Sequence, residues 1–202
     1  MPTRCFGCGN RLGSTQAYGA CQRCWLGLDP LDRGGSHLQD GTRVVSAVRD
    51  TDVARRFLLR AKFGRRPEIY GPMGRMMASA LRDFPQRPDD IIPVPSHPWD
   101  TLVRGFAPGL ELARVVSSRT GVPVRRLIHR GWRPWTRFKR LDRAGRRALA
   151  LRAFRLPHDL RGRHVLLVDD LMTTGHTLLA CARCCRSAGA RGTSGLVWSS
   201  AS

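Results

Sequence analysis

An apolar run that leads directly into two acids and a threonine-rich turn constrains this chain most. Val165–Val168 are all apolar, Asp169 and Asp170 follow, and a helix-like stretch begins at about residue 177. This order predicts a buried strand with two carboxylates at its carboxyl end, which is where open α/β sheets bind ligands. Thr173–Thr177 are small and include Gly175, so several N–H groups can point at one anion before a helix. The pattern predicts a ribose 5-phosphate site; the alternative is an ordinary strand ending in an acidic turn.

The same segment resembles the phosphoribosyl-pyrophosphate (PRPP) motif of the type I phosphoribosyltransferase fold, because it contains the complete series Asp-Asp-x-x-Thr-Thr-Gly-x-Thr after hydrophobic residues. The resemblance implies that Asp169 and Asp170 hold the 2′ and 3′ hydroxyls of ribose. It also implies that Mg²⁺ accompanies PRPP. It implies as well that Thr173–Thr177 hold the 5′-phosphate. The PRPP-binding residues expected after the two acids are Leu171, Met172, Thr173, Thr174, Gly175, His176 and Thr177.

A second loop follows the candidate strand Asp90–Pro95 and contains Ser96, Arg104 and Gly105. Gly105 allows close backbone approach, and a guanidinium such as that of Arg104 can pair bidentately with phosphate. This loop suits the pyrophosphate half of PRPP, whose departing negative charge must be stabilised. We therefore expect Asp169, Asp170 and Arg104 to be the catalytic residues. The alternative is a surface loop with a solvated arginine.

Four cysteines near the start form two CxxC pairs, Cys5/Cys8 and Cys21/Cys24, separated by twelve residues. Four thiolates form a closed tetrahedral zinc site of the structural type. The first residues include no apolar stretch typical of a signal peptide, so a metal is favoured over disulfides. A redox pair or plain structural thiols are the alternatives. Such a short segment depends on metal binding to fold, and we expect chelation to unfold residues 1 to about 28.

Three further cysteines, Cys181, Cys184 and Cys185, fall on the helix expected after the phosphate loop. Two of them share a helix face with Leu178 and Leu179, where a buried thiol behaves as a small hydrophobic group. Core packing is therefore the prediction, with a second metal or redox site as the alternative.

The formal net charge of +20 favours contact with nucleic acid, anionic lipid or phosphorylated substrates. Almost all of the positive charge is arginine, and it is scattered along the chain, so a generic basic surface is the alternative to nucleic-acid binding. We find no apolar run near the roughly 20 residues that span a bilayer. The expected location is the cytoplasm, or the inner face of the membrane through a partner.

Alternating strand and helix patterns predict an α/β fold with a parallel sheet covered on both faces by helices. We expect a four-cysteine zinc-binding segment at 1–28, a linker at 29–41 and a phosphoribosyltransferase-like domain at 42–202. The expected strands lie at 43–48, 90–95, 122–128, 164–168 and 193–198. The expected helices lie at 52–62, 71–84, 108–120 and 177–188, and 130–150 is expected to form an arginine-rich mobile loop.

The whole arrangement resembles the ComF family, in which a four-cysteine zinc knuckle precedes a phosphoribosyltransferase-like domain. The resemblance includes Lys62-Phe-Gly64, Ile92–Pro95 and Arg104-Gly-Phe106. In the mobile loop it includes Thr136, Arg143 and Arg146, and it implies that an arginine there neutralises the pyrophosphate. The family is associated with DNA uptake in natural competence. The chain departs from the family pattern at Ala107, Pro108, Lys139 and Leu149.

Three functions follow as hypotheses. The first is binding of PRPP or another phosphorylated ribose together with single-stranded DNA, for which Trp132, Trp135 and Phe138 offer stacking surfaces among arginines. The second is an active phosphoribosyltransferase that moves ribose 5-phosphate from PRPP to an amine. Thr173 stands where purine-salvage members of the fold carry an Asp, so a purine acceptor is disfavoured. The third is a non-catalytic scaffold for a DNA-uptake motor or membrane partner.

Overall fold

The computed structural model describes residues 4–13, 19–29, 35–64, 66–131 and 154–201 of the 202-residue chain. Its centre is a five-stranded sheet in the order β1-β2-β7-β6-β3. β2 (Arg43–Arg49), β7 (Gly192–Ser200), β6 (His164–Met172) and β3 (Asp90–Pro93) run parallel, and β1 (Gly35–His37) pairs antiparallel with β2. The predicted α/β class with a parallel sheet is confirmed.

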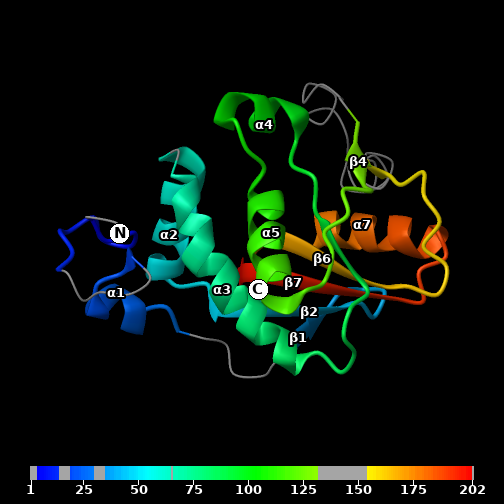
Figure 1. The fold of residues 1–202 in the computed structure, drawn as a ribbon, viewed down its shortest axis with the longest axis horizontal. Coiled ribbons are helices and arrows are strands. Elements are labelled where there is room, and N and C mark those ends of the chain that lie inside the picture. The colour runs from blue at the N-terminus through cyan, green and yellow to red at the C-terminus, as the bar shows by residue number, and fades with distance from the viewer. Residues whose placement is uncertain (1–3, 14–18, 30–34, 65, 132–153, 202) are drawn as a thin grey trace.

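Helices cover both faces of the sheet (Figure 1). α2 (Asp52–Phe63), α3 (Tyr70–Ala80) and α5 (Pro108–Thr120) share one apolar core with alternate residues of β6 and β7. α7 (His176–Ser187) covers the opposite face, where Val165 and Leu167 point. The alternation of strand side chains between the two faces explains why both sides of β6 are apolar.

Glycines in α3 and α5 let these helices approach their neighbours closely. A Cβ on Gly74 would lie 2.5 Å from a carbon of Val115 in α5. A Cβ on Gly109 would lie 2.9 Å from the carbonyl oxygen of Val94 and 3.1 Å from that of Val168. The first turn of α5 therefore rests directly on the backbone just after β3 and in the middle of β6.

Several expected elements differ in the structure. The strand expected at 122–128 is reduced to a bridge between Val124 and Ile91, partly because Pro123 has no N–H to donate. A short two-stranded sheet follows, formed by β4 (His129–Arg130) and β5 (Phe154–Arg155). α4 (Pro98–Arg104) is a helix where a loop was expected, and β1 lies inside the expected linker.

The shorter elements complete the chain: α1 (Gln22–Leu26), the 3₁₀ helix η2 (Pro67–Ile69) and the 3₁₀ helix η3 (Leu81–Asp83). The cysteine-bearing segment packs against α2, where the Phe6 ring meets the Phe57 ring edge-on at 6.3 Å. Phe57 in turn stacks on the buried Trp198 of β7, with ring centroids 6.1 Å apart. The cysteine segment thus extends the core on this face of the sheet.

Candidate functional site

The two acids of the motif lie where β6 loses one of its two neighbours. Pairing of β6 with β3 ends at the Val168–Pro93 register, whereas pairing with β7 continues to Met172. The strand therefore extends beyond its predicted end at residue 168 and includes Asp169 and Asp170. Because β3 has left the sheet at this point, the carboxylates lie at an edge that neighbouring loops can approach.

Thr173–Thr177 connect β6 to α7 in a tight turn. Gly175 adopts a left-handed conformation with φ of 70°, and its Cβ would lie 2.7 Å from Leu38, so both the backbone and the space require glycine. No side chain caps the N-terminus of α7, and its first turn carries no acid. Thr173, Thr174 and His176 are exposed, and Thr174 Oγ1 lies 3.0 Å from His176 Nδ1. Uncapped N–H groups behind exposed hydroxyls are suited to an anion.

Asp170 forms an ion pair with a residue that lies outside the Asp-Asp motif. Its Oδ2 lies 2.6 Å from Nζ of Lys62, in the last turn of α2, and the two side chains are 7% and 19% exposed. A lysine at this distance supplies the counter-charge that a buried carboxylate needs. Lys62 belongs to the residues that carry the ComF resemblance, but nothing in its sequence neighbourhood indicates this contact.

Asp169 has a different electrostatic environment from its neighbour. Burial raises the pKa of Asp169 to about 8, and the negative charge of Asp170 adds to this effect. Its Oδ1 accepts the N–H of Asp170 at 2.9 Å. The site therefore combines one carboxylate neutralised by lysine with one that holds its proton more tightly than an ordinary aspartate.

The residues of the second predicted loop approach the same region from α4. Arg104 is the last residue of α4. Its Nη2 lies 3.7 Å from Oδ2 of Asp100, and its guanidinium carbon lies 5.5 Å from the centroid of the Phe63 ring. Gly105 terminates the helix with φ of 81°, and Ser96 lies partly buried between β3 and α4. Arg104 is thus held by a carboxylate and an aromatic ring, with its side chain 18% exposed.

Two residues near the acids were not predicted from the sequence. Tyr70 has a buried hydroxyl with no hydrogen-bond partner among the described residues, and burial together with the charge of Asp170 raises its pKa. The guanidinium carbon of Arg130 lies 5.5 Å from the centroid of the Phe154 ring. Burial lowers the pKa of Arg130, and the negative charges of Asp100 and Asp169 partly oppose this shift. Both depend on contacts between distant segments, which explains why no local pattern indicated them.

The predicted mobile-loop residues Thr136, Arg143 and Arg146 lie outside the described residues, as do the aromatic candidates Trp132, Trp135 and Phe138. Their predicted roles in holding pyrophosphate and stacking bases stay predictions.

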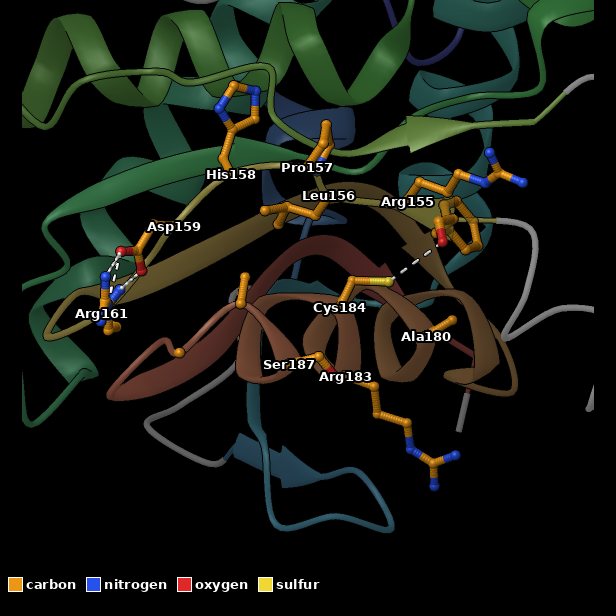
Figure 2. A pocket seen from close by; sticks show the side chains of 13 residues that line it. Arg155, Leu156, Pro157, His158, Asp159, Arg161, Ala180, Arg183, Cys184 and Ser187 are labelled. Atoms are coloured by element: carbon orange, nitrogen blue, oxygen red, sulfur yellow. Dashed lines mark hydrogen bonds and ion pairs between the residues drawn. The ribbon is translucent and has the colours of Figure 1, made fainter.

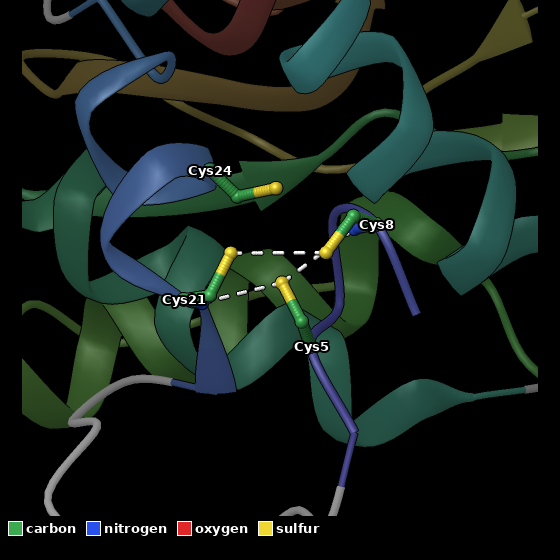
Figure 3. A group of neighbouring side chains, drawn as sticks. All are labelled: Cys5, Cys8, Cys21 and Cys24. Carbon is green, nitrogen blue, oxygen red and sulfur yellow. Dashed lines mark hydrogen bonds between the residues drawn. The ribbon is translucent and has the colours of Figure 1, made fainter. Parts of the chain in front are cut away.

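The thiols of Cys5, Cys8, Cys21 and Cys24 point toward one another (Figure 3), and all four sulfurs lie within 4.8 Å of one another. Cys8 Sγ and Cys21 Sγ are 3.7 Å apart, close to the sulfur–sulfur separation in a tetrahedron with metal–sulfur bonds of about 2.3 Å. Backbone N–H groups of Cys8 and Cys21 donate to Cys5 Sγ. Burial raises the pKa of Cys5, but these and neighbouring N–H groups outweigh it and lower that pKa to about 6. The cluster fits a metal ion bound by four thiolates.

The other cysteines do not form a metal cluster with other described residues. Cys181 and Cys185 are buried in the core beneath α7, where burial raises the pKa of both thiols. Cys184 faces a pocket of about 710 Å³ between α7 and the segment after β5, where its thiol donates to the Phe154 carbonyl at 3.6 Å (Figure 2). This pocket contains none of the residues predicted to bind PRPP. Asp159 in its wall is already paired with Arg161.

Within the described residues, we find no helix with both the length and the apolar character needed to cross a membrane.

Comparison with known proteins identifies one family and several similar proteins and structures. Residues 65–195 match the family described as phosphoribosyl transferase domain. The DNA utilization protein YhgH of Shigella flexneri is 27% identical over 194 residues, which cover 90% of this chain and 77% of that protein. The purine phosphoribosyltransferase structure from Pyrococcus horikoshii Ot3 is 22% identical with a TM-score of 0.41, covering 61% of this chain and 67% of that one. The structure of TT1426 from Thermus thermophilus is 17% identical with a TM-score of 0.39, covering 64% and 82%.

Proposed function

The chain belongs to the phosphoribosyl transferase domain family, and on this premise we propose that it binds PRPP or another 5-phosphorylated ribose beside the end of β6. Two features together carry the proposal. Two carboxylates lie just beyond the point where β3 stops pairing with β6, and the N-terminus of α7 next to them has no cap from a described side chain. Phosphate favours such a helix N-terminus because the helix dipole and the free N–H groups act together.

In the proposed complex, Asp169 and Asp170 accept hydrogen bonds from the ribose 2′ and 3′ hydroxyls, and Thr173–Thr177 surround the 5′-phosphate. Lys62 pairs with Asp170, so ribose must share that carboxylate with the ammonium group or displace it. The Tyr70 hydroxyl, which has no hydrogen-bond partner among the described residues, offers a further polar contact to the ligand.

We further propose that this activity serves DNA utilisation, as a ComF-type protein. The similarity to the DNA utilization protein YhgH along 90% of the chain supports this role. The net charge of +20 favours association with single-stranded DNA through phosphate contacts. A cytoplasmic location, with contact to a membrane-associated uptake motor, is part of the same proposal.

An active phosphoribosyltransferase is the second candidate, supported by the position of Arg104 beside the site. An amine nitrogen would form a bond to ribose C1 while the bond from C1 to the pyrophosphate oxygen breaks and the amine releases a proton. The negative charge would accumulate on pyrophosphate, where Arg104 and an arginine such as Arg143 or Arg146 neutralise it.

Two metal ions belong to the proposal. Zn²⁺ is the expected occupant of the four thiolates, because soft sulfur ligands in a tetrahedral set favour it. Mg²⁺ would arrive with PRPP and neutralise phosphate oxygens while it keeps several waters.

Calorimetric titration of the protein with PRPP and Mg²⁺, combined with a pyrophosphate-release assay with and without amines, tests these proposals. We expect binding that Asp170→Asn weakens at least tenfold and that Asp159→Asn, at an exposed acid outside the site, leaves unchanged. Pyrophosphate release that requires Asp170 supports the enzyme. Absence of binding by PRPP and ribose 5-phosphate in the folded wild-type protein contradicts the ribose-phosphate site.

A further inference from the structure

A second pocket, of about 640 Å³, lies between the C-terminal ends of α3 and α5, apart from the two carboxylates of the motif. In Figure 1 both helices end on the lower side of the molecule, whereas α4 projects from the upper side. The chain after α3 and the start of the segment after α5 complete its wall. Among the described residues, none of those assigned above to ribose, phosphate or metal lines this pocket.

Arginines from separate segments surround the pocket. The lining includes Arg75 in α3, Arg82 in η3, Arg87 in the following segment and Arg119 in the last turn of α5. Arg87 Nη2 donates to the carbonyl of Thr120 at 2.8 Å, which fixes that guanidinium against α5. No acidic side chain is among the described lining residues.

The charge in this pocket exceeds what the helix ends require. Each helix C-terminus contributes about half a negative charge, and α3 and α5 together contribute about one. The guanidinium groups of Arg82, Arg87 and Arg119 alone exceed this negative charge, so the pocket has a net positive charge. The lining also includes the apolar residues Leu81, Phe84 and Val122, of which Phe84 and Val122 are buried. Several arginines together with an aromatic ring are suited to a ligand that has phosphate and a flat apolar ring.

We propose that this pocket binds one nucleotide of a single-stranded nucleic acid, with its base near Phe84 and its flanking phosphates on Arg82, Arg87 and Arg119. The guanidinium groups hold phosphate oxygens bidentately, and the exposed ring of the base replaces water over the apolar surface. The proposal deepens the nucleic-acid part of the proposed function and assigns it to a site separate from ribose-phosphate binding.

Fluorescence anisotropy with a labelled twelve-nucleotide oligothymidine, and with an abasic strand of equal length, tests this assignment. We compare wild-type protein with Arg82→Glu/Arg119→Glu and with Arg56→Glu/Arg126→Glu. The control pair changes net charge equally at exposed arginines outside the pocket. The pocket pair is expected to weaken oligothymidine binding at least tenfold, and the control pair less than threefold. Wild-type protein is expected to bind the abasic strand at least fivefold more weakly.

Equal losses in the two charge-reversed proteins would overturn the proposal, because they would indicate diffuse attraction to a basic surface. Equal affinity of wild-type protein for the two strands would also overturn it. Thermal melting verifies that each variant is folded, and Arg82→Gln/Arg119→Gln replaces the charge reversal if melting changes. PRPP binding of each variant is titrated separately. If the pocket variant loses strand binding but retains PRPP binding, the arginine pocket acts independently of the ribose-phosphate site, so the two proposals can fail separately.

Discussion

At the scale of single residues, the two neighbouring carboxylates of the site differ in what surrounds them. The charge of the buried Asp170 carboxylate is compensated by Lys62. Removing either partner of a buried ion pair leaves an uncompensated charge. We expect Lys62→Met to lower the free energy of unfolding by about 3 kcal/mol, measured by urea denaturation. Adding Asp170→Asn to Lys62→Met should recover much of this loss. The surface pair Arg114–Glu111 is the control. Arg114→Met should lower the free energy of unfolding by less than about 1 kcal/mol. Independent, additive effects of the two site substitutions would contradict the coupling.

Asp169 should make stability depend on pH in the opposite sense to an ordinary salt-bridged aspartate. Its raised pKa means that the folded protein binds a proton between pH about 4, the unfolded value, and pH about 8. Stability should therefore fall as pH rises through this window. Asp169→Asn should remove this component of the slope in denaturation measured at pH 5 to 8. Asp159→Asn should not, because Arg161 lowers the pKa of Asp159 and it titrates below this window. An unchanged slope in Asp169→Asn would rule out the raised pKa.

At the scale of secondary-structure elements, the position of α5 depends on close contact with the sheet. A Cβ at Gly109 would meet the carbonyl oxygens of Val94 and Val168, and neither backbone can move without disturbing β3 or β6. We expect Gly109→Ala to lower the free energy of unfolding by about 2 kcal/mol and to weaken PRPP binding. Gly71→Ala in α3 is the matched control. Its Cβ would meet only the end of Arg75 at 3.7 Å, so the higher helix propensity of alanine should make it neutral or slightly stabilising. Equal melting temperatures for the two variants would refute the close-contact argument.

At the scale of the whole molecule, the cysteine segment and the phosphoribosyltransferase-like domain share one apolar core. Phe6, Phe57 and Trp198 connect the four-cysteine cluster to the central sheet, and Arg60 donates to the carbonyl of Cys5 at 3.2 Å. The effect of chelation should therefore extend beyond residues 1 to about 28. We expect metal removal to lower the melting temperature of the entire chain by at least about 5 °C, measured by calorimetry, and excess Zn²⁺ to restore it.

Matched cysteine substitutions separate metal binding from packing. Cys21→Ala should reproduce the effect of chelation, whereas Cys184→Ala, at a partly buried thiol outside the cluster, should respond to chelator like the wild type. If the chelator leaves the melting temperature of the chain unchanged, the expected coupling is contradicted, and the cysteine segment folds independently of the central sheet.

The local motifs predicted much of the site because their chemistry is contained in short segments. The run from Val165 to Thr177 predicted a strand, a turn and a helix, and the structure contains β6, a turn at Gly175 and α7 in this order. The two CxxC pairs predicted a four-thiol cluster, which the structure contains. Apolar residues at helical spacing also predicted α2, and the helix expected at 108–120 is present as α5. The strand at 122–128 was wrong because its apolar residues pack at the edge of β3 without forming a ladder.

The sequence by itself determined the fold class, the position of the two acids and the threonine-rich turn at the end of a strand, and the four-thiol cluster, because each follows from local sequence patterns. Only the tertiary structure decided which distant groups surround them. Lys62 reaches Asp170 because α2 and β6 meet at the carboxyl edge of the sheet. The arginine pocket exists because α3 and α5 end side by side. Such contacts depend on packing between elements, and a charged residue on a helix looks the same in the sequence whether it faces solvent or a buried carboxylate.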